Sequence, residues 1–136
     1  MASAQHQRVL VVDDDAPLLD LMCRYLRRLG YTVDGCSGPE EAWSRIEDDP
    51  AAYCLALLDL RMPGMGGNTL AKRILQCNPS IRLVVVSGYS VEQSGIETLD
   101  GSRVTFLQKP FTPAGLTEAV RQTEAPPVSA SANLPV

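Results

Sequence analysis

The sequence has few of the residues that build metal sites from nitrogen and sulfur. It contains one histidine, His6, and four cysteines, Cys23, Cys36, Cys54 and Cys77, without any Cys-x-x-Cys pair. Zinc sites need clustered cysteine and histidine ligands, so this spacing excludes them. Because each cysteine lies inside or at the end of an apolar segment, where a thiol behaves as a small hydrophobic group, we expect four buried free thiols.

Long apolar runs and an excess of positive charge are also missing. No apolar run approaches the roughly 20 residues of a membrane-spanning helix, and the N-terminal MASAQHQR lacks the apolar core of a signal peptide. A formal net charge of -4 gives no electrostatic footprint for nucleic acid or an anionic membrane. We expect a cytoplasmic protein that neither inserts into a membrane nor binds nucleic acid directly.

What the sequence does contain is the composition of one globular domain. Its 136 residues suit a single core, and 45% are hydrophobic while 21% are charged. We expect a flexible N-terminal arm at 1–6, a domain at 7–123 and a disordered tail at 124–136, because the tail is rich in proline, serine and alanine and has little to bury.

Short apolar runs recur along the chain and predict buried strands. Continuous apolarity without alternation is typical of parallel strands that are covered on both faces. The predicted strands are Arg8–Val12, Thr32–Cys36, Tyr53–Leu58, Arg82–Val86 and Val104–Gln108.

Helical spacing separates these runs. Apolar residues from Leu18 to Leu29 recur every three or four positions and stop at Gly30, and Leu70, Ile74 and Leu75 follow the same spacing. A capping box from Ser37 to Glu40 predicts a helix at Pro39–Asp48, and Thr112–Pro113 predicts the start of the last helix. The glycines and proline of Met62–Gly67 predict a loop. Val91–Leu99, which contains Gly95, predicts only a weak and short helix.

Strands that alternate with helices predict a doubly wound α/β fold. Parallel neighbours need crossover connections, so helices cover both faces of the sheet. In such sheets, ligands bind outside the carboxyl ends of the strands. The residues that follow the strands are therefore the candidate site.

Polar groups stand at four of these strand ends. Asp13-Asp14-Asp15 follows the first strand, Asp59 the third, Ser87 the fourth and Lys109 the fifth. Two carboxylates 4 Å apart repel by about 4 kcal/mol at an effective dielectric constant of 20, so the cluster needs a cation. Carboxylate oxygens without histidine or thiolate partners suit Mg²⁺. Lys109 and Ser87 then supply a charge and a hydroxyl to a phosphoryl group on Asp59.

Each of these residues also has a purely structural interpretation. Asp15 is a suitable N-cap, Asp59 can hydrogen-bond within the loop that follows it, Ser87 can cap a helix, and Lys109 can simply be solvated. Their joint occurrence at four separate strand ends favours a functional site.

Four motifs carry a resemblance to a known family. VLVVDDD at 9–15, LLDLRMPGMGG at 57–67, VVVSGYS at 84–90 and FLQKPF at 106–111 resemble, in order, the motifs of CheY-like response regulator receiver domains. The resemblance implies a (βα)5 fold with strand order 2-1-3-4-5. It also implies a phosphorylation switch in a His-Asp phosphorelay.

The resemblance assigns a role to each matching residue. Asp59 is the phosphoacceptor, Asp14 the direct Mg²⁺ ligand, Asp13 the water-mediated ligand, and Arg61 a ligand through its backbone carbonyl. Ser87 is the switch hydroxyl, Lys109 contacts the phosphoryl group, Phe106 changes rotamer on activation, and Pro110 follows Lys109 through a cis bond. Phe106 is equally compatible with plain core packing.

The same resemblance implies the partners and the setting of the chain. A histidine kinase or phosphotransfer domain donates the phosphoryl group, Mn²⁺ substitutes for Mg²⁺, and a downstream protein reads the switch. The chain is then a monomer or weak dimer, and not an enzyme beyond weak loss of its own phosphoryl group. Both a stand-alone regulator and the C-terminal receiver of a hybrid histidine kinase remain open. Two features depart from the family pattern: Gly66, where many relatives carry aspartate, and the glycine in the predicted fourth helix. In the family, the fourth helix and the fifth strand commonly form the output face, so we do not expect dimerisation through that face.

Three other classes of protein are alternatives to this interpretation. A haloacid-dehalogenase-like phosphatase needs a second aspartate two residues after its nucleophile, where this chain has Arg61. A flavodoxin-like FMN binder needs a loop without carboxylates after the first strand. An interaction domain of receiver fold that is never phosphorylated remains, and phosphorylation assays distinguish it.

Overall fold

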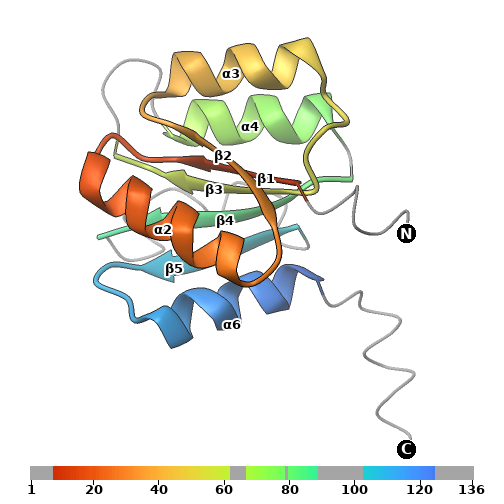
Figure 1. Ribbon diagram of the computed structural model, residues 1–136. Coiled ribbons are helices and arrows are strands. Elements are labelled where there is room, and N and C mark those ends of the chain that lie inside the picture. The colour runs from red at the N-terminus through yellow and green to blue at the C-terminus, as the bar shows by residue number, and fades with distance from the viewer. Residues whose placement is uncertain (1–7, 62–66, 79, 89–102, 125–136) are drawn as a thin grey trace, which may run out of the picture.

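The chain forms a five-stranded parallel sheet between two layers of helices (Figure 1). This computed structural model describes residues 8–61, 67–78, 80–88 and 103–124. The strands are β1 (Arg8–Val12), β2 (Thr32–Cys36), β3 (Leu55–Asp59), β4 (Arg82–Ser87) and β5 (Val104–Gln108), and the helices are α2 (Ala16–Arg28), α3 (Pro39–Asp48), α4 (Gly67–Cys77) and α6 (Pro113–Glu124). The strand order β2-β1-β3-β4-β5 confirms the predicted fold.

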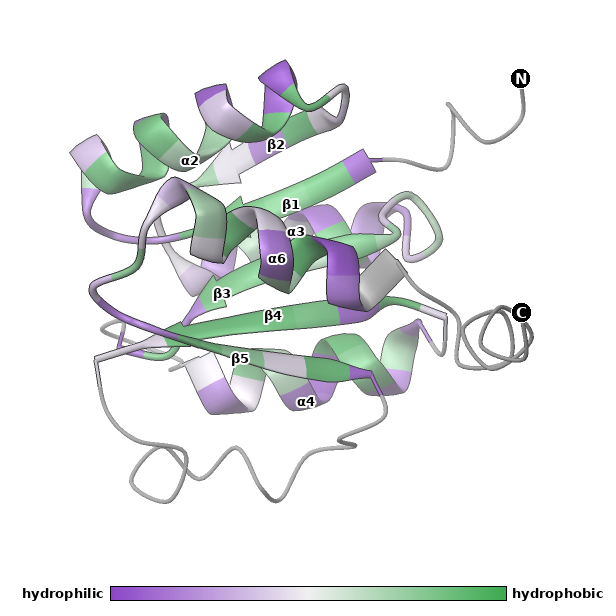
Figure 2. Cartoon of the chain, turned by 90° about the horizontal axis from the view of Figure 1, so that it is seen from below, coloured by the Kyte–Doolittle hydropathy of each residue, from purple (hydrophilic) through white to green (hydrophobic). Residues whose placement is uncertain are grey.

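The apolar runs became strands because helices cover both faces of the sheet. Alternate residues of one strand point to opposite faces. Leu10 and Leu58 pack under α3 and α4, whereas Val11 and Leu57 pack under α2 and α6. All five residues of β3 are buried. Figure 2 shows strands that are mostly hydrophobic and helices that mix hydrophobic with hydrophilic residues.

Three helix termini follow the sequence signals. The Asp15 carboxylate accepts a hydrogen bond from the Leu18 backbone N–H at 3.3 Å and caps α2. Gly30 ends that segment with φ +104°, a left-handed conformation that favours glycine. At α6, the Thr112 hydroxyl accepts from the Gly115 N–H at 3.0 Å. These ends fix where the chain leaves β1 and β5.

The predicted capping box at Ser37 is wrong by one residue. Gly38 is the N-cap of α3 and makes no side-chain cap. Pro39 has no N–H and a fixed φ, which suits the first helical position, so the cap falls on the residue before it. The Glu41 carboxylate instead accepts a hydrogen bond from the Ser37 N–H at 3.3 Å.

Gly67 also differs from its expected place in the loop, because it is the first residue of α4. A Cβ at Gly67 would lie 2.7 Å from the Asp59 carbonyl oxygen and 2.5 Å from the Leu60 Cα. Only glycine therefore lets α4 begin this close to the end of β3. The site depends on that approach.

The four cysteines are free thiols, as expected. Cys23 and Cys36 are buried, but Cys54, just before β3, and Cys77, the last residue of α4, are partly exposed. No helix in the described parts of the chain is long and apolar enough to cross a membrane. The arm, residues 125–136 of the tail, residues 62–66 of the loop with Gly66, and the helix at Val91–Leu99 lie outside the described residues and stay predictions. The predicted start of the tail is wrong by one residue, because Glu124 is the last residue of α6.

Candidate phosphoryl and metal site

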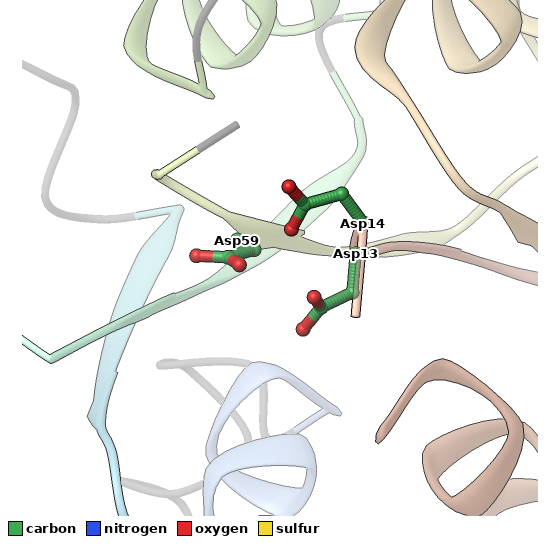
Figure 3. A group of neighbouring side chains, drawn as sticks. All are labelled: Asp13, Asp14 and Asp59. Carbon is green, nitrogen blue, oxygen red and sulfur yellow. The ribbon is translucent and has the colours of Figure 1, made fainter. Parts of the chain in front are cut away.

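Three carboxylates meet at the carboxyl edge of the sheet (Figure 3). Asp13 and Asp14 follow β1, and Asp59 ends β3, the strand that pairs with β1. One oxygen from each carboxylate lies within 4.8 Å of the other two. The parallel topology thus brings together acidic residues that are distant in the sequence.

Asp13 is the buried member that the local backbone holds in place. Its N–H continues the sheet ladder by donating to the Cys36 carbonyl at 3.1 Å, and its side chain is fully buried. Its Oδ1 accepts from the Asp15 N–H at 2.9 Å. Burial, together with the charge of Asp59, raises the pKa of Asp13 to about 6.

Asp59 is 5% exposed, and each of its carboxylate oxygens has a different neighbour. Oδ1 accepts a hydrogen bond from the Arg61 N–H at 3.0 Å. Oδ2 lies 3.3 Å from the Lys109 ammonium. The backbone therefore orients the carboxylate while the other oxygen faces a cation.

Lys109 reaches the carboxylates from the end of β5. Its N–H donates to the Ser87 carbonyl at 2.8 Å, and its ammonium also lies 3.5 Å from Asp13 Oδ2. Burial lowers the pKa of Lys109, but the Asp13 and Asp59 charges outweigh burial and raise it, so the side chain is protonated at neutral pH. The Lys109–Pro110 bond is cis, the isomer that the resemblance implied.

Ser87 and Phe106 lie on the two strands beside Asp59. Ser87 is fully buried at the end of β4, one residue after Val86, the register partner of Asp59. Phe106 pairs with Val85 in β5 and packs, partly buried, against the core cluster under α3 and α4. Both positions agree with the predicted placement, and their switch roles stay predictions.

A cavity of about 350 Å³ opens onto this edge, with Asp14, Asp59, Arg61, Gly88 and Lys109 among its lining residues. Asp14 and Arg61 are exposed, so a small ligand reaches the carboxylates from solvent. Three close carboxylate oxygens are the hard ligands that Mg²⁺ prefers, so the residues present fit this ion. The Asp59 carboxylate also lies beside the Lys109 ammonium.

The backbone bond to Asp59 agrees with the structural interpretation that the sequence offered for this residue, whereas the backbone bond to Asp13 was not expected. The N–H groups of Asp15 and Arg61 each bond the aspartate two residues earlier. Such Asx-type bonds follow from an aspartate that enters a turn, and the Pro-Gly loop after Asp59 was the available signal. These backbone bonds orient one oxygen of each carboxylate, and Lys109 contacts the other oxygen of each.

Comparison with known proteins agrees with this geometry. The family model described as "response regulator receiver domain" matches residues 9–121. The chain is 28% identical to the chemotaxis protein CheY of Thermotoga maritima over 85% of this chain and 96% of that protein. It is 29% identical to the C4-dicarboxylate transport transcriptional regulatory protein DctD of Rhizobium meliloti, over 85% of this chain but 25% of that protein.

Solved structures show the same likeness. The receiver domain of the hybrid histidine kinase CckA matches with a TM-score of 0.72 and 31% identity, over 85% of this chain and 97% of that one. A CheY-like receiver from Methanospirillum hungatei JF-1 matches with a TM-score of 0.76 and 28% identity, over 86% and 92%. The chain spans half or less of the length of the first curated relatives, which are longer proteins.

Proposed function

The chain belongs to the response regulator receiver domain family, and from that premise we propose that Asp59 accepts a phosphoryl group from a phosphohistidine. Receiver domains are the switches of two-component signalling. The observation that carries the assignment to Asp59 is its position between the Lys109 ammonium, 3.3 Å from Oδ2, and the Arg61 N–H, 3.0 Å from Oδ1. Asp13 is buried more deeply and Asp14 lies on the exposed side, so Asp59 is the held and reachable carboxylate.

The transfer is an in-line displacement at phosphorus. A carboxylate oxygen of Asp59 forms the new P–O bond as the P–N bond to the donor histidine breaks. The electron pair of the P–N bond returns to the imidazole, which takes up a proton. Lys109 holds its positive charge beside the developing anion. Asp13, Asp14, Asp59 and the Arg61 carbonyl would hold Mg²⁺ or Mn²⁺, which neutralises charge on the phosphoryl oxygens when bound.

Ser87 and Phe106 would report the modification. Ser87 follows the register partner of Asp59 by one residue, and movement of its side chain toward the new anion would leave room for Phe106 to change rotamer. A shift of a two-state equilibrium from 1:99 to 99:1 needs about 5.5 kcal/mol. A few charge-assisted contacts from Ser87, Lys109 and the metal supply energy of that size.

Partners and setting form the rest of the proposal. A histidine kinase or phosphotransfer domain supplies the phosphoryl group in the cytoplasm, and a downstream protein reads the switch. The only reaction of the domain is acceptance and slow loss of this group. A stand-alone regulator and the receiver of a longer hybrid kinase both remain compatible with the relatives.

Intact-mass analysis after treatment with acetyl phosphate and Mg²⁺ tests the proposal. We expect one phosphoryl adduct on the wild type, none on Asp59→Asn, and one on the control Asp20→Asn, whose exposed carboxylate pairs with Arg24 away from the site. A wild type that gains no adduct from acetyl phosphate or from a panel of kinases would contradict it.

A further inference from the structure

An apolar groove lies beside α2, next to the acidic cavity. It has a volume of about 460 Å³, and Leu21 and Tyr25 of α2, Pro110 and Phe111 after β5, and Leu116 of α6 line most of it. We name it the α2 groove. Its volume would hold several aliphatic side chains.

Leu21 stands at the rim of the α2 groove and is 62% exposed. Among the described residues, the other exposed large apolar side chain is Leu29, which is 42% exposed and does not line the groove. Removing a leucine side chain from water contributes about 1.5–3 kcal/mol. A protruding apolar side chain beside an apolar groove forms a self-complementary surface.

The charges around α2 complement a second copy of the same helix. Asp15 is the N-cap of α2, six residues before Leu21, and Arg27 and Arg28 lie in the last turn, six and seven residues after Leu21. Leu21 therefore lies midway between an acidic end and a basic end of α2. When two copies of α2 run antiparallel with Leu21 at the centre, the acidic end of each helix faces the basic end of the other.

We propose that the α2 groove binds a second copy of this chain, with the two α2 helices antiparallel and each Leu21 seated in the groove of the other copy. The arrangement is a two-fold interface in which both copies use the same residues. Asp15 of one copy then lies near Arg27 and Arg28 of the other. This pairing goes beyond the proposed phosphoryl transfer and does not depend on it.

The location of the α2 groove also couples pairing to the acidic site. Lys109 lines both the groove and the acidic cavity. A second copy seated on α2 therefore covers one side of the approach to Asp59. If phosphoryl transfer proceeds as proposed, a large protein donor must compete with the second copy, whereas acetyl phosphate need not.

Sedimentation velocity over a concentration series tests the pairing. A small interface with one central apolar anchor should give a dimer with a Kd between about 10 µM and about 1 mM. Leu21→Arg should raise that Kd about tenfold or more, because it removes the central side chain. The matched control Leu29→Arg adds the same charge to the same helix outside the groove and should change the Kd less than about twofold.

A second variant tests the charge pairing. Arg28→Glu places like charges opposite one another, so it should weaken the dimer severalfold, and salt should weaken the wild-type dimer. A wild type that stays monomeric up to about 1 mM overturns the proposal. Equal effects of Leu21→Arg and Leu29→Arg overturn it too. A monomer whose binding to a kinase is lost in Leu21→Arg would assign the groove to that partner instead.

Discussion

The Lys109 ammonium lies 3.3 Å from Asp59 Oδ2 although 50 residues separate the two in the sequence. The same ammonium lies 3.5 Å from Asp13 Oδ2, so one cation serves two carboxylates of the cluster. β5 and β3 are not neighbours, and the Lys109 N–H bonds the Ser87 carbonyl on the intervening strand. The parallel order of the strands is therefore what brings the lysine to the acceptor.

Removal of this cation should separate phosphoryl transfer from metal binding. Lys109→Met takes a positive charge away from the developing phosphoryl anion, so we expect Asp59 phosphorylation by acetyl phosphate to slow by about tenfold or more. Mg²⁺ should bind severalfold more tightly, because the ion no longer meets the lysine charge. Rates from intact mass and affinities from calorimetry measure the two effects, and Lys72→Met on the exposed side of α4 is the control. An unchanged rate with weaker Mg²⁺ binding would contradict this role for Lys109.

Mg²⁺ should stabilise the folded chain through the three carboxylates. At ten times its Kd, a ligand that binds only the folded state adds about 1.4 kcal/mol. We expect a higher melting temperature in Mg²⁺ than in EDTA, and loss of that difference in Asp14→Asn. Asp20→Asn should keep it, since Asp20 pairs with Arg24 elsewhere on α2. An equal Mg²⁺ effect in both variants would show that the ion binds elsewhere.

Asp13 should make stability fall with pH when metal is absent. Its pKa is about 6 in the folded chain, above the ordinary value near 4, so the folded state holds the proton more tightly. The free energy of unfolding therefore decreases as pH rises from about 4 to about 6. Urea titrations in EDTA should find Asp13→Asn more stable than the wild type. This difference in the free energy of unfolding should be about 1 kcal/mol larger at pH 7.5 than at pH 5. A gap that narrows with pH would be inconsistent with a raised pKa.

Much of the fold and site could be predicted because the information is local. The apolar runs at β1, β3 and β4 lack alternation, which requires cover on both faces, and polar residues follow each of them. Once the strands are parallel, Asp13, Asp59, Ser87 and Lys109 must share an edge. The cap of α3 was predicted at Ser37 and lies at Gly38, although the sequence carried the signal, because Pro39 suits the first helical position and leaves the cap to the residue before it.

Contacts between distant elements were also beyond the sequence. At the amino end of the sheet, Asp34 Oδ2 accepts hydrogen bonds from Arg8 at 2.8 Å and from the Tyr53 hydroxyl at 2.6 Å. No local pattern marks Asp34, because its partners come from β1 and from the segment before β3. The α2 groove is likewise formed by side chains from three separate parts of the chain.

Asp34 provides a stability prediction that is independent of the site. Burial raises its pKa, but the bonds from Tyr53 and Arg8 outweigh burial and lower it. Its contribution is thus present above about pH 4 and lost as pH falls through the lowered pKa. Asp34→Asn should destabilise the chain by about 1–2 kcal/mol at pH 7 in urea unfolding, and by less near pH 3. The control Asp20→Asn, which removes the exposed ion pair with Arg24, should lower the free energy of unfolding by less than about 0.5 kcal/mol. Equal losses in the two variants would contradict the network.

The central claim is that Asp59 itself carries the phosphoryl group, and borohydride trapping tests it most directly. Borohydride reduces an aspartyl phosphate to homoserine, and peptide mass spectrometry then locates that residue. After treatment with acetyl phosphate and Mg²⁺, we predict homoserine at position 59 in the wild type and none without the phosphodonor. Homoserine at position 13 or 14, or at no position in a chain that has gained a phosphoryl adduct, would contradict the account.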